Sequence, residues 1–148
     1  MRKTTILLAA LVLAEAAQAQ LPGLRRRDPV PVQPVLVGID ALRADFIAQS
    51  GGDTVYFGGD SAALTPQSRA TLAAQAMWLR RHPEVVVRIE GHADRSDTRD
   101  HALAVGARRA EEVRDYLVLL GVPAAQLTTL SWGKERPGAQ RAQTVLVR

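Results

Sequence analysis

The sequence predicts a two-layer α/β sandwich, with helices on one face of a small sheet. Two long segments carry apolar residues at the spacing of an amphipathic helix, and four short segments are rich in apolar strand-forming residues. They follow one another in the order strand, helix, strand, helix, strand, strand, which favours helices packed against one sheet. The 148 residues, 47% hydrophobic and 23% charged, suffice for one such domain.

The first half of the domain contains three predicted elements. Apolar residues at helical spacing predict a short helix from residue 39 to a Gly-Gly pair at 51–52, and the apolar triplet at 55–57 predicts a strand. Thr65 and Pro66 are a typical N-cap and first helical residue, so the next helix begins there and ends by His82, which precedes a proline.

The second half contains the longest predicted helix. Alternating apolar residues over 85–90 predict a strand with one face in the core and the other partly solvated. Apolar residues spaced by threes and fours predict a helix over 103–120, which Gly121 terminates. Two further strands are expected at 127–132 and 144–147.

Residues 1–19 have the pattern of a secretory signal peptide. A positive start, Met1-Arg2-Lys3, precedes an apolar run and the small-residue cleavage site Ala17-Gln18-Ala19. The run is shorter than the roughly 20 apolar residues that span a bilayer, although an uncleaved membrane anchor is the alternative. Cleavage after Ala19 would lower the net charge of +4 by one.

Residues 20–38 form a predicted linker, which contains four prolines and Arg25-Arg26-Arg27. Proline fixes φ and removes backbone donors, so we expect an extended tether before a folded domain at 39–148. The alternative is a contact of the three arginines with an anionic surface such as lipid headgroups.

The chain contains no cysteine, which excludes disulfides, thiolate metal sites, a thiol nucleophile and a lipid attached through an N-terminal cysteine. Aromatic residues make up only 4% of the chain, and the arginines are interspersed with acidic residues. Both features argue against a nucleic-acid partner.

Four segments carry motifs that identify a family. They are Val55-Tyr56-Phe57 with Asp60, Ile89-Glu90-Gly91-His92-Ala93-Asp94 with Thr98, Ala107-Arg108-Arg109-Ala110 with Val113 and Tyr116-Leu117, and Ser131-Trp132-Gly133-Lys134-Glu135-Arg136-Pro137. In unbroken order, they resemble the OmpA-like domain, whose family includes the peptidoglycan-associated lipoproteins (Pal). The resemblance implies a βαβαβ core with a mixed sheet and helices on one face.

The resemblance also implies non-covalent binding of peptidoglycan through the diaminopimelate of the stem peptide. The side-chain end of diaminopimelate carries an ammonium and a carboxylate on one carbon, which a carboxylate and a guanidinium can bind together. Motif for motif, the family's two ligand-binding residues are Asp94 and Arg109. Spacing alone leaves another interpretation open, in which Asp94 caps the loop backbone or pairs with Arg109 to steady the turn. Arg108 points away on the helix and is expected to be solvated or structural.

Further residues of these motifs are weaker candidates for ligand binding. Gly58, Gly59 and Asp60 follow the first strand, which in the family forms another wall of the ligand cleft, although a simple flexible turn is the alternative. Ala93 and Thr98 belong to the motif that contains Asp94.

The chain departs from the family at two places. Relatives often carry a large apolar residue at the position of Gly59, so a ligand contact is lost here. Relatives also carry an Asn-Arg-Arg signature before the last strand. One alignment sets Arg141 at the Asn position and another sets Thr144 there, but neither restores two arginines.

Two enzymatic interpretations compete with binding. His92, Asp94 and His101 suggest a metal site, and Ser96 with His92 and Asp94 suggests a hydrolytic trio, but neither spacing has a supporting motif. We therefore expect no enzymatic activity, no cofactor and no metal. The alternatives to wall binding are an envelope adaptor that acts through protein partners, or a periplasmic metal-dependent hydrolase.

The export signal and the resemblance together predict a periplasmic, wall-associated protein that supports cell-envelope integrity and has no lipid anchor. In the lipoprotein relatives, the domain ties the outer membrane to the wall and engages the Tol system. The resemblance thus names peptidoglycan, and the Tol system or other envelope proteins, as partners.

Overall fold

The computed structural model describes residues 38–137 and 140–147. The predicted signal peptide and all of the predicted linker except Gly38 lie outside the described residues. The helices and strands are, in order, α1 (Ile39–Ser50), β1 (Thr54–Tyr56), α2 (Pro66–Arg81), β2 (Val87–His92), α3 (Arg99–Leu119), the 3₁₀ helix η1 (Ala124–Gln126), β3 (Leu127–Gly133) and β4 (Arg141–Leu146).

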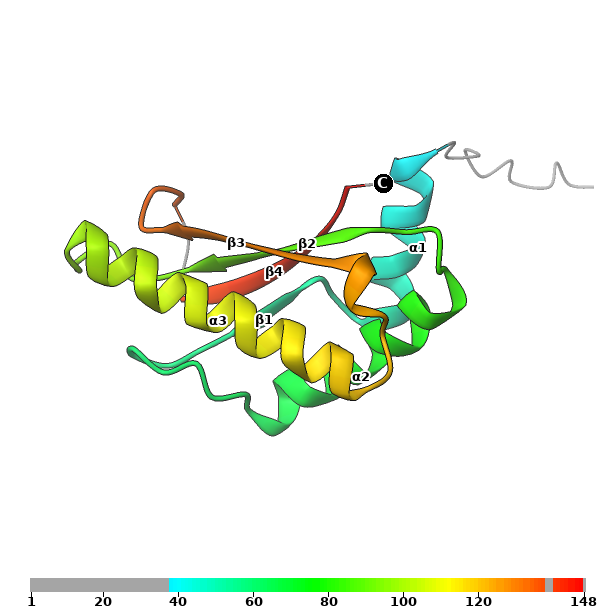
Figure 1. Ribbon diagram of the computed structural model, residues 1–148, viewed down its shortest axis with the longest axis horizontal. Coiled ribbons are helices and arrows are strands. Elements are labelled where there is room, and N and C mark those ends of the chain that lie inside the picture. Colours follow the sequence, from blue (N-terminus) through cyan, green and yellow to red (C-terminus); the bar gives the residue numbers. More distant parts are fainter. Residues whose placement is uncertain (1–37, 138–139, 148) are drawn as a thin grey trace, which may run out of the picture. The chain divides into compact units, whose positions relative to one another are not determined.

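The strands form one mixed sheet in the order β1-β4-β2-β3. β4 is antiparallel to both of its neighbours, whereas β2 and β3 are parallel. The last strand of the chain therefore lies between the first two. Helices α2 and α3 lie on the same side of the sheet, and α3 runs along β2 and β3 (Figure 1). This arrangement confirms the predicted α/β fold with a mixed sheet.

Local capping chemistry sets the ends of the helices. The Thr65 hydroxyl accepts a hydrogen bond from the Ser68 N–H at 3.1 Å and starts α2. Thr98 accepts from the His101 N–H at 3.4 Å and starts α3. Gly121, which follows α3, has φ of +90°, a conformation that glycine adopts without steric cost.

The main core lies between the sheet and α2 and α3, and α1 extends it. Val87 and Ile89 of β2 are fully buried in this core. Trp78 of α2 packs edge-on against Phe46 of α1, with 5.2 Å between ring centroids. The Trp78 indole N–H also donates to Asp45 at 2.7 Å, so the polar tip of this buried ring is satisfied where α1 meets α2. A second small cluster, Ala93, Ala102 and Val105, lies where β2 leads into α3.

Several predicted boundaries were wrong. α3 begins at Arg99 rather than 103, because Thr98 caps a polar first turn that apolar periodicity does not detect. β2 begins two residues later than predicted and continues to His92. β4 begins at Arg141 rather than 144, because pairing with β1 and β2 recruits polar residues into the strand.

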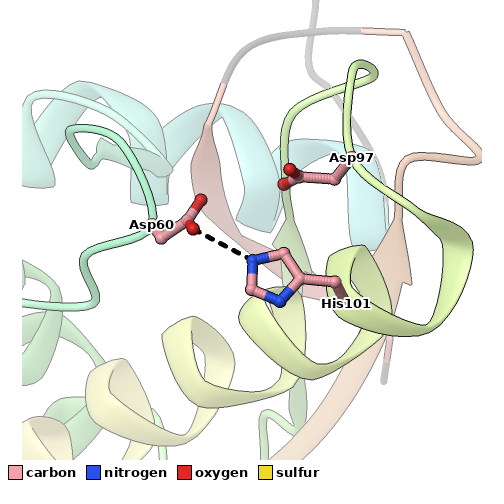
Figure 2. Close-up of side chains that lie close together, drawn as sticks. All are labelled: Asp60, Asp97 and His101. Atoms are coloured by element: carbon pink, nitrogen blue, oxygen red, sulfur yellow. Dashed lines mark hydrogen bonds and ion pairs between the residues drawn. The ribbon is translucent and has the colours of Figure 1, made fainter.

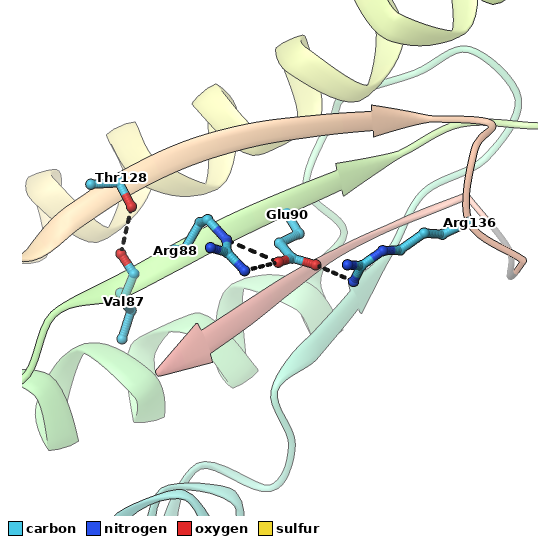
Figure 3. A network of polar contacts seen from close by, with 5 residues as sticks. All are labelled: Val87, Arg88, Glu90, Thr128 and Arg136. Carbon is cyan, nitrogen blue, oxygen red and sulfur yellow. Dashed lines mark hydrogen bonds and ion pairs between the residues drawn. The ribbon is translucent and has the colours of Figure 1, made fainter. Parts of the chain in front are cut away.

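Glu90 was expected on a partly solvated face, but it is only 2% exposed. Its carboxylate accepts from the Arg88 Nη2 at 2.7 Å and from the Arg136 Nη1 at 3.1 Å (Figure 3). The Arg136 guanidinium in turn stacks 3.7 Å from the centroid of the Trp132 ring. The two arginines pair with the carboxylate, and the paired charges offset the cost of its burial.

Within the described ranges, no helix is both long and apolar enough to cross a membrane.

Candidate functional site

Arg109 is the most completely enclosed charged residue of the predicted site. It lies in the middle of α3, and its exposed fraction is zero. The guanidinium donates to three backbone carbonyls, those of Ser61 at 2.9 Å, His92 at 2.8 Å and Gly59. Arg109 therefore ties the loop after β1 to the end of β2.

Burial and neighbouring charges have opposite effects on the pKa of Arg109. Burial lowers the pKa of Arg109, while the negative charges of Asp60, Asp97 and Asp94 raise it. The ring of Phe57 lies 5.2 Å from the guanidinium carbon and adds a cation–π contact. Of the five N–H groups, three donate to carbonyls in the part of the chain that the structure describes.

Asp94 lies two residues beyond the carbonyl of His92 that Arg109 binds, and its side chain is exposed. One carboxylate oxygen accepts from the Ser96 N–H at 3.2 Å, and the other accepts from the Gln140 amide at 3.2 Å. These hydrogen bonds, that from Ser96 first, lower the pKa of Asp94. Asp94 therefore caps the loop backbone, which is one of the two roles left open by its spacing.

The second open role, a direct ion pair between Asp94 and Arg109, does not occur among the described residues. The two side chains instead flank the end of β2, one buried and one exposed. Arg108 is exposed, as the helical geometry predicts.

The weaker candidates surround this pair. Gly58 and Gly59 have open space where a Cβ would stand, and Gly59 has φ of +50°. Ala93 is buried, and its N–H donates to the Gly133 carbonyl at 2.8 Å. Thr98 caps α3 with its hydroxyl. Ala93 and Thr98 thus have structural roles in holding the loop that carries Asp94.

The structure does not assemble the two enzymatic arrangements. His92 is 1% exposed, and neither of its ring nitrogens has a hydrogen-bond partner within the described ranges. It therefore activates neither Ser96 nor Asp94. The metal-type cluster that the structure does form is Asp60, Asp97 and His101. Asp97 was not predicted as a site residue, because Asp60 is distant from it in sequence and its spacing to His101 is unremarkable.

The positions aligned with the missing Asn-Arg-Arg signature lie in β4. Arg141 pairs with Tyr56 at the start of that strand. Thr144 is buried, and its hydroxyl donates to Gln75 at 2.9 Å. Thr144 thus anchors the sheet to α2, and its hydrogen bonds within the described ranges reach neither Asp94 nor Arg109.

Known proteins share sequence similarity with this chain. The OmpA family model matches residues 56–146. The chain is 49% identical over 88 residues to a peptidoglycan-associated lipoprotein of Rhizobium meliloti, covering 60% of this chain and 50% of the relative. It is 43% identical over 101 residues to that of Pseudomonas aeruginosa, covering 68% of this chain and 60% of the relative. The chain thus spans about half the length of the curated relatives it matches.

Solved structures of other proteins have a similar fold. The crystal structure of the peptidoglycan-associated lipoprotein from Burkholderia pseudomallei superposes with a TM-score of 0.63 at 37% identity, covering 66% of this chain and 92% of that chain. The C-terminal domain of Helicobacter pylori MotB shares the fold, with a TM-score of 0.60 at 21% identity, covering 65% of this chain and 84% of that chain. Together with the family model, which matches more than half of the sequence, these similarities show that the chain belongs to the OmpA family.

Proposed function

We propose that this chain binds peptidoglycan non-covalently in the periplasm and carries out no reaction. The observation that carries the proposal is the match of the OmpA family model to residues 56–146, which include Asp94 and Arg109, together with 49% identity over 88 residues to a peptidoglycan-associated lipoprotein. The proposed route to the periplasm is export by the signal peptide at 1–19, which leaves 20–38 as an extended linker in front of the wall-binding domain. Tol-system or other envelope proteins are the proposed protein partners.

The proposed ligand is the zwitterionic end of diaminopimelate in the stem peptide. Asp94 is exposed and, because its pKa is lowered, it is ionised at neutral pH and can accept from the ligand ammonium. Arg109 supplies the positive charge for the ligand carboxylate. Both groups flank the end of β2, as recognition of two opposite charges on one carbon requires.

The ligand carboxylate must reach a guanidinium that the loop after β1 covers. The Gly59 carbonyl occupies one of the Arg109 N–H groups. A carboxylate that displaces this neutral acceptor forms a stronger, charge-assisted hydrogen bond. Glycine at 58 and 59 gives this loop the backbone freedom to move aside.

Co-sedimentation with purified sacculi tests the proposal. We expect the wild-type chain to pellet with the sacculi. In a titration with sacculi, Asp94→Asn should raise the dissociation constant at least about tenfold, since a charge-assisted hydrogen bond contributes roughly 1.5–3 kcal/mol. Asp115→Asn, an exposed residue near the other end of α3, is the charge-matched control and should bind as the wild type does. A wild-type chain that stays in the supernatant would contradict wall binding and leave the protein-adaptor alternative.

Ligand chemistry provides an independent test of Arg109. Soluble stem peptides with a free or an amidated diaminopimelate carboxylate should compete differently for the chain. The amidated peptide should bind at least about tenfold more weakly, because the guanidinium loses its charged partner. Equal competition by the two peptides would show that Arg109 does not recognise the ligand carboxylate. It would say nothing about Asp94, which the sacculus experiment tests separately.

A further inference from the structure

Three side chains from separate segments converge beside the proposed ligand site. Asp60 lies in the loop after β1, Asp97 in the loop before α3, and His101 in the first turn of α3 (Figure 2). One potential ligand atom of each residue lies within 4.8 Å of the other two. The His101 Nε2 is 3.0 Å from a carboxylate oxygen of Asp60. No other group of three or more such side chains occurs in the part of the chain searched, residues 38–137 and 140–147.

The carboxylate of Asp97 is incompletely satisfied. Its Oδ2 atom is excluded from solvent and has no hydrogen-bond partner among the described residues. Figure 2 shows the carboxylate directed toward the side on which Asp60 lies. A buried anionic oxygen without a donor or cation is costly, so this atom identifies a place for a positively charged partner.

Charged groups of both signs surround the cluster. The charged residues that act on Arg109 are three carboxylates, those of Asp60, Asp97 and Asp94, and one further guanidinium, that of Arg108. Lys134, whose ammonium donates to the Asp97 carbonyl at 2.5 Å, is a third positive charge beside these carboxylates, so acidic and cationic side chains are balanced in number. The N-terminus of α3 carries a partial positive charge of about 0.5 and opposes cation binding, but each of the two ligating carboxylates carries a full negative charge.

The donor set selects the class of ion. Two carboxylate oxygens and one imidazole nitrogen suit zinc and similar divalent transition metals, whereas magnesium and calcium prefer oxygen ligands alone. Around a tetrahedral ion bound at about 2.1 Å, ligand atoms are about 3.4 Å apart. The three ligand atoms lie within 4.8 Å of one another, so the widest separation must shorten by up to about 1.4 Å. The side chains of Asp60 and His101 are 61% and 45% exposed and can rotate to close this gap.

We propose that Asp60, Asp97 and His101 form a binding site for a divalent transition-metal ion such as Zn²⁺. Three protein ligands leave at least one coordination position open to water or to an oxygen ligand. The site is distinct from Asp94 and Arg109, although Asp60 also belongs to the loop proposed to border the peptidoglycan ligand. Metal binding requires no peptidoglycan, so its test is independent of wall binding.

Calorimetric titration of the untagged, chelator-treated chain with ZnCl₂ tests this site. We expect one ion per chain, with a dissociation constant on the order of micromolar. His101→Gln and Asp97→Asn should each weaken binding at least tenfold. Asp100→Asn is the control, because it removes one negative charge from the first turn of α3 at a residue outside the cluster. It should change the affinity for Zn²⁺ less than twofold.

Two controls keep the result interpretable. Circular dichroism checks that each variant is folded. If His101→Gln or Asp97→Asn does not fold, Asp60→Asn is used in its place, because the Asp60 side chain is exposed. Nitrogen chemical shifts of His101 should change on addition of Zn²⁺, which reports direct ligation. The proposal is overturned if the wild type does not bind Zn²⁺, if His101→Gln binds with wild-type affinity, or if the His101 nitrogens do not respond.

Discussion

Gly91 of β2 and Gly106 of α3 lie in direct backbone contact. A Cβ atom built on Gly91 would be 1.8 Å from the Gly106 carbonyl oxygen and 3.2 Å from the Cβ of Ala110. A Cβ on Gly106 would in turn be 2.4 Å from the Ser131 hydroxyl of β3. These contacts bring α3 close to the sheet, which sets the distance between Arg109 and the end of β2.

Gly91→Ala should therefore destabilise the domain strongly. The new methyl group meets rigid helix backbone rather than a flexible side chain, so α3 must shift, at a cost of about 3 kcal/mol. Thermal denaturation should show a decrease in Tm of more than about 10 °C. Gly58→Ala is the matched control, because a Cβ there meets nothing within 4 Å, and its Tm should be near that of the wild type. Equal Tm values for the two variants would contradict the close packing.

Arg109→Lys should lower stability even without any ligand. An ammonium cannot reproduce the three hydrogen bonds to Gly59, Ser61 and His92. The His92 carbonyl is buried, so leaving it unpaired costs about 1–3 kcal/mol, whereas water can compensate at the exposed Gly59 and Ser61. Urea denaturation should show a lower midpoint for this variant. Arg108→Lys, at the exposed neighbouring position, should remain within about 0.5 kcal/mol of the wild type. If both variants unfold at the wild-type midpoint, Arg109 does not hold the loop after β1.

The stability of the domain should fall as pH decreases from about 6.5 to about 4. Burial, with a contribution from the charge of Arg141, lowers the pKa of His92 from 6.5 to about 4. Between these pH values the unfolded chain binds a proton that the folded chain does not, so stability rises with pH across this window and is lost on acidification. The full effect of His92 is about 3 kcal/mol.

His92→Leu separates this effect from the titration of carboxylates. Neither ring nitrogen of His92 has a partner within the described ranges, so an apolar side chain of similar size leaves no described group unpaired. We expect the decrease in Tm between pH 7 and pH 4.5 to be smaller in this variant than in the wild type. An unchanged decrease would show that His92 does not cause the pH dependence.

Glu90→Gln should destabilise the domain by about 1–3 kcal/mol, because the uncharged amide loses two charge-assisted interactions with Arg88 and Arg136. The side chains of these arginines are 39% and 48% exposed, so water compensates part of the loss. Glu135→Gln breaks only an exposed pair with Arg99 and should cost less than about 1 kcal/mol. Guanidinium denaturation of both variants measures the difference, and an equal effect would mean that burial of Glu90 is energetically unimportant.

Sequence patterns predicted the helices well where local chemistry controls them. Thr65 and Pro66 mark the start of α2, Gly51 and Gly121 follow the ends of α1 and α3, and all are recognisable without tertiary structure. The start of α3 was predicted four residues late, because the polar residues of its first turn carry no apolar periodicity. Apolar alternation likewise detected β2 but placed its bounds two residues early.

The candidate site was predictable only in part. The motif resemblance named Asp94 and Arg109, and helical geometry separated Arg109 from the exposed Arg108. The cluster of Asp60, Asp97 and His101 was not predicted, because a loop after one strand must fold against the start of a distant helix to form it. The burial of Glu90 was missed for a similar reason, since Arg136 reaches it from another segment.

By itself, the sequence determined the helices, the approximate strands, the α/β class and the OmpA-like motifs, since all of these depend on residues close together in the chain. The tertiary structure decided that β4 lies between β1 and β2, that Arg109 binds the carbonyls of Gly59, Ser61 and His92, and that Asp97 meets His101 and Asp60. These features join segments far apart in sequence. Their contacts form only when burial of the core brings the segments together, and no local pattern encodes that proximity.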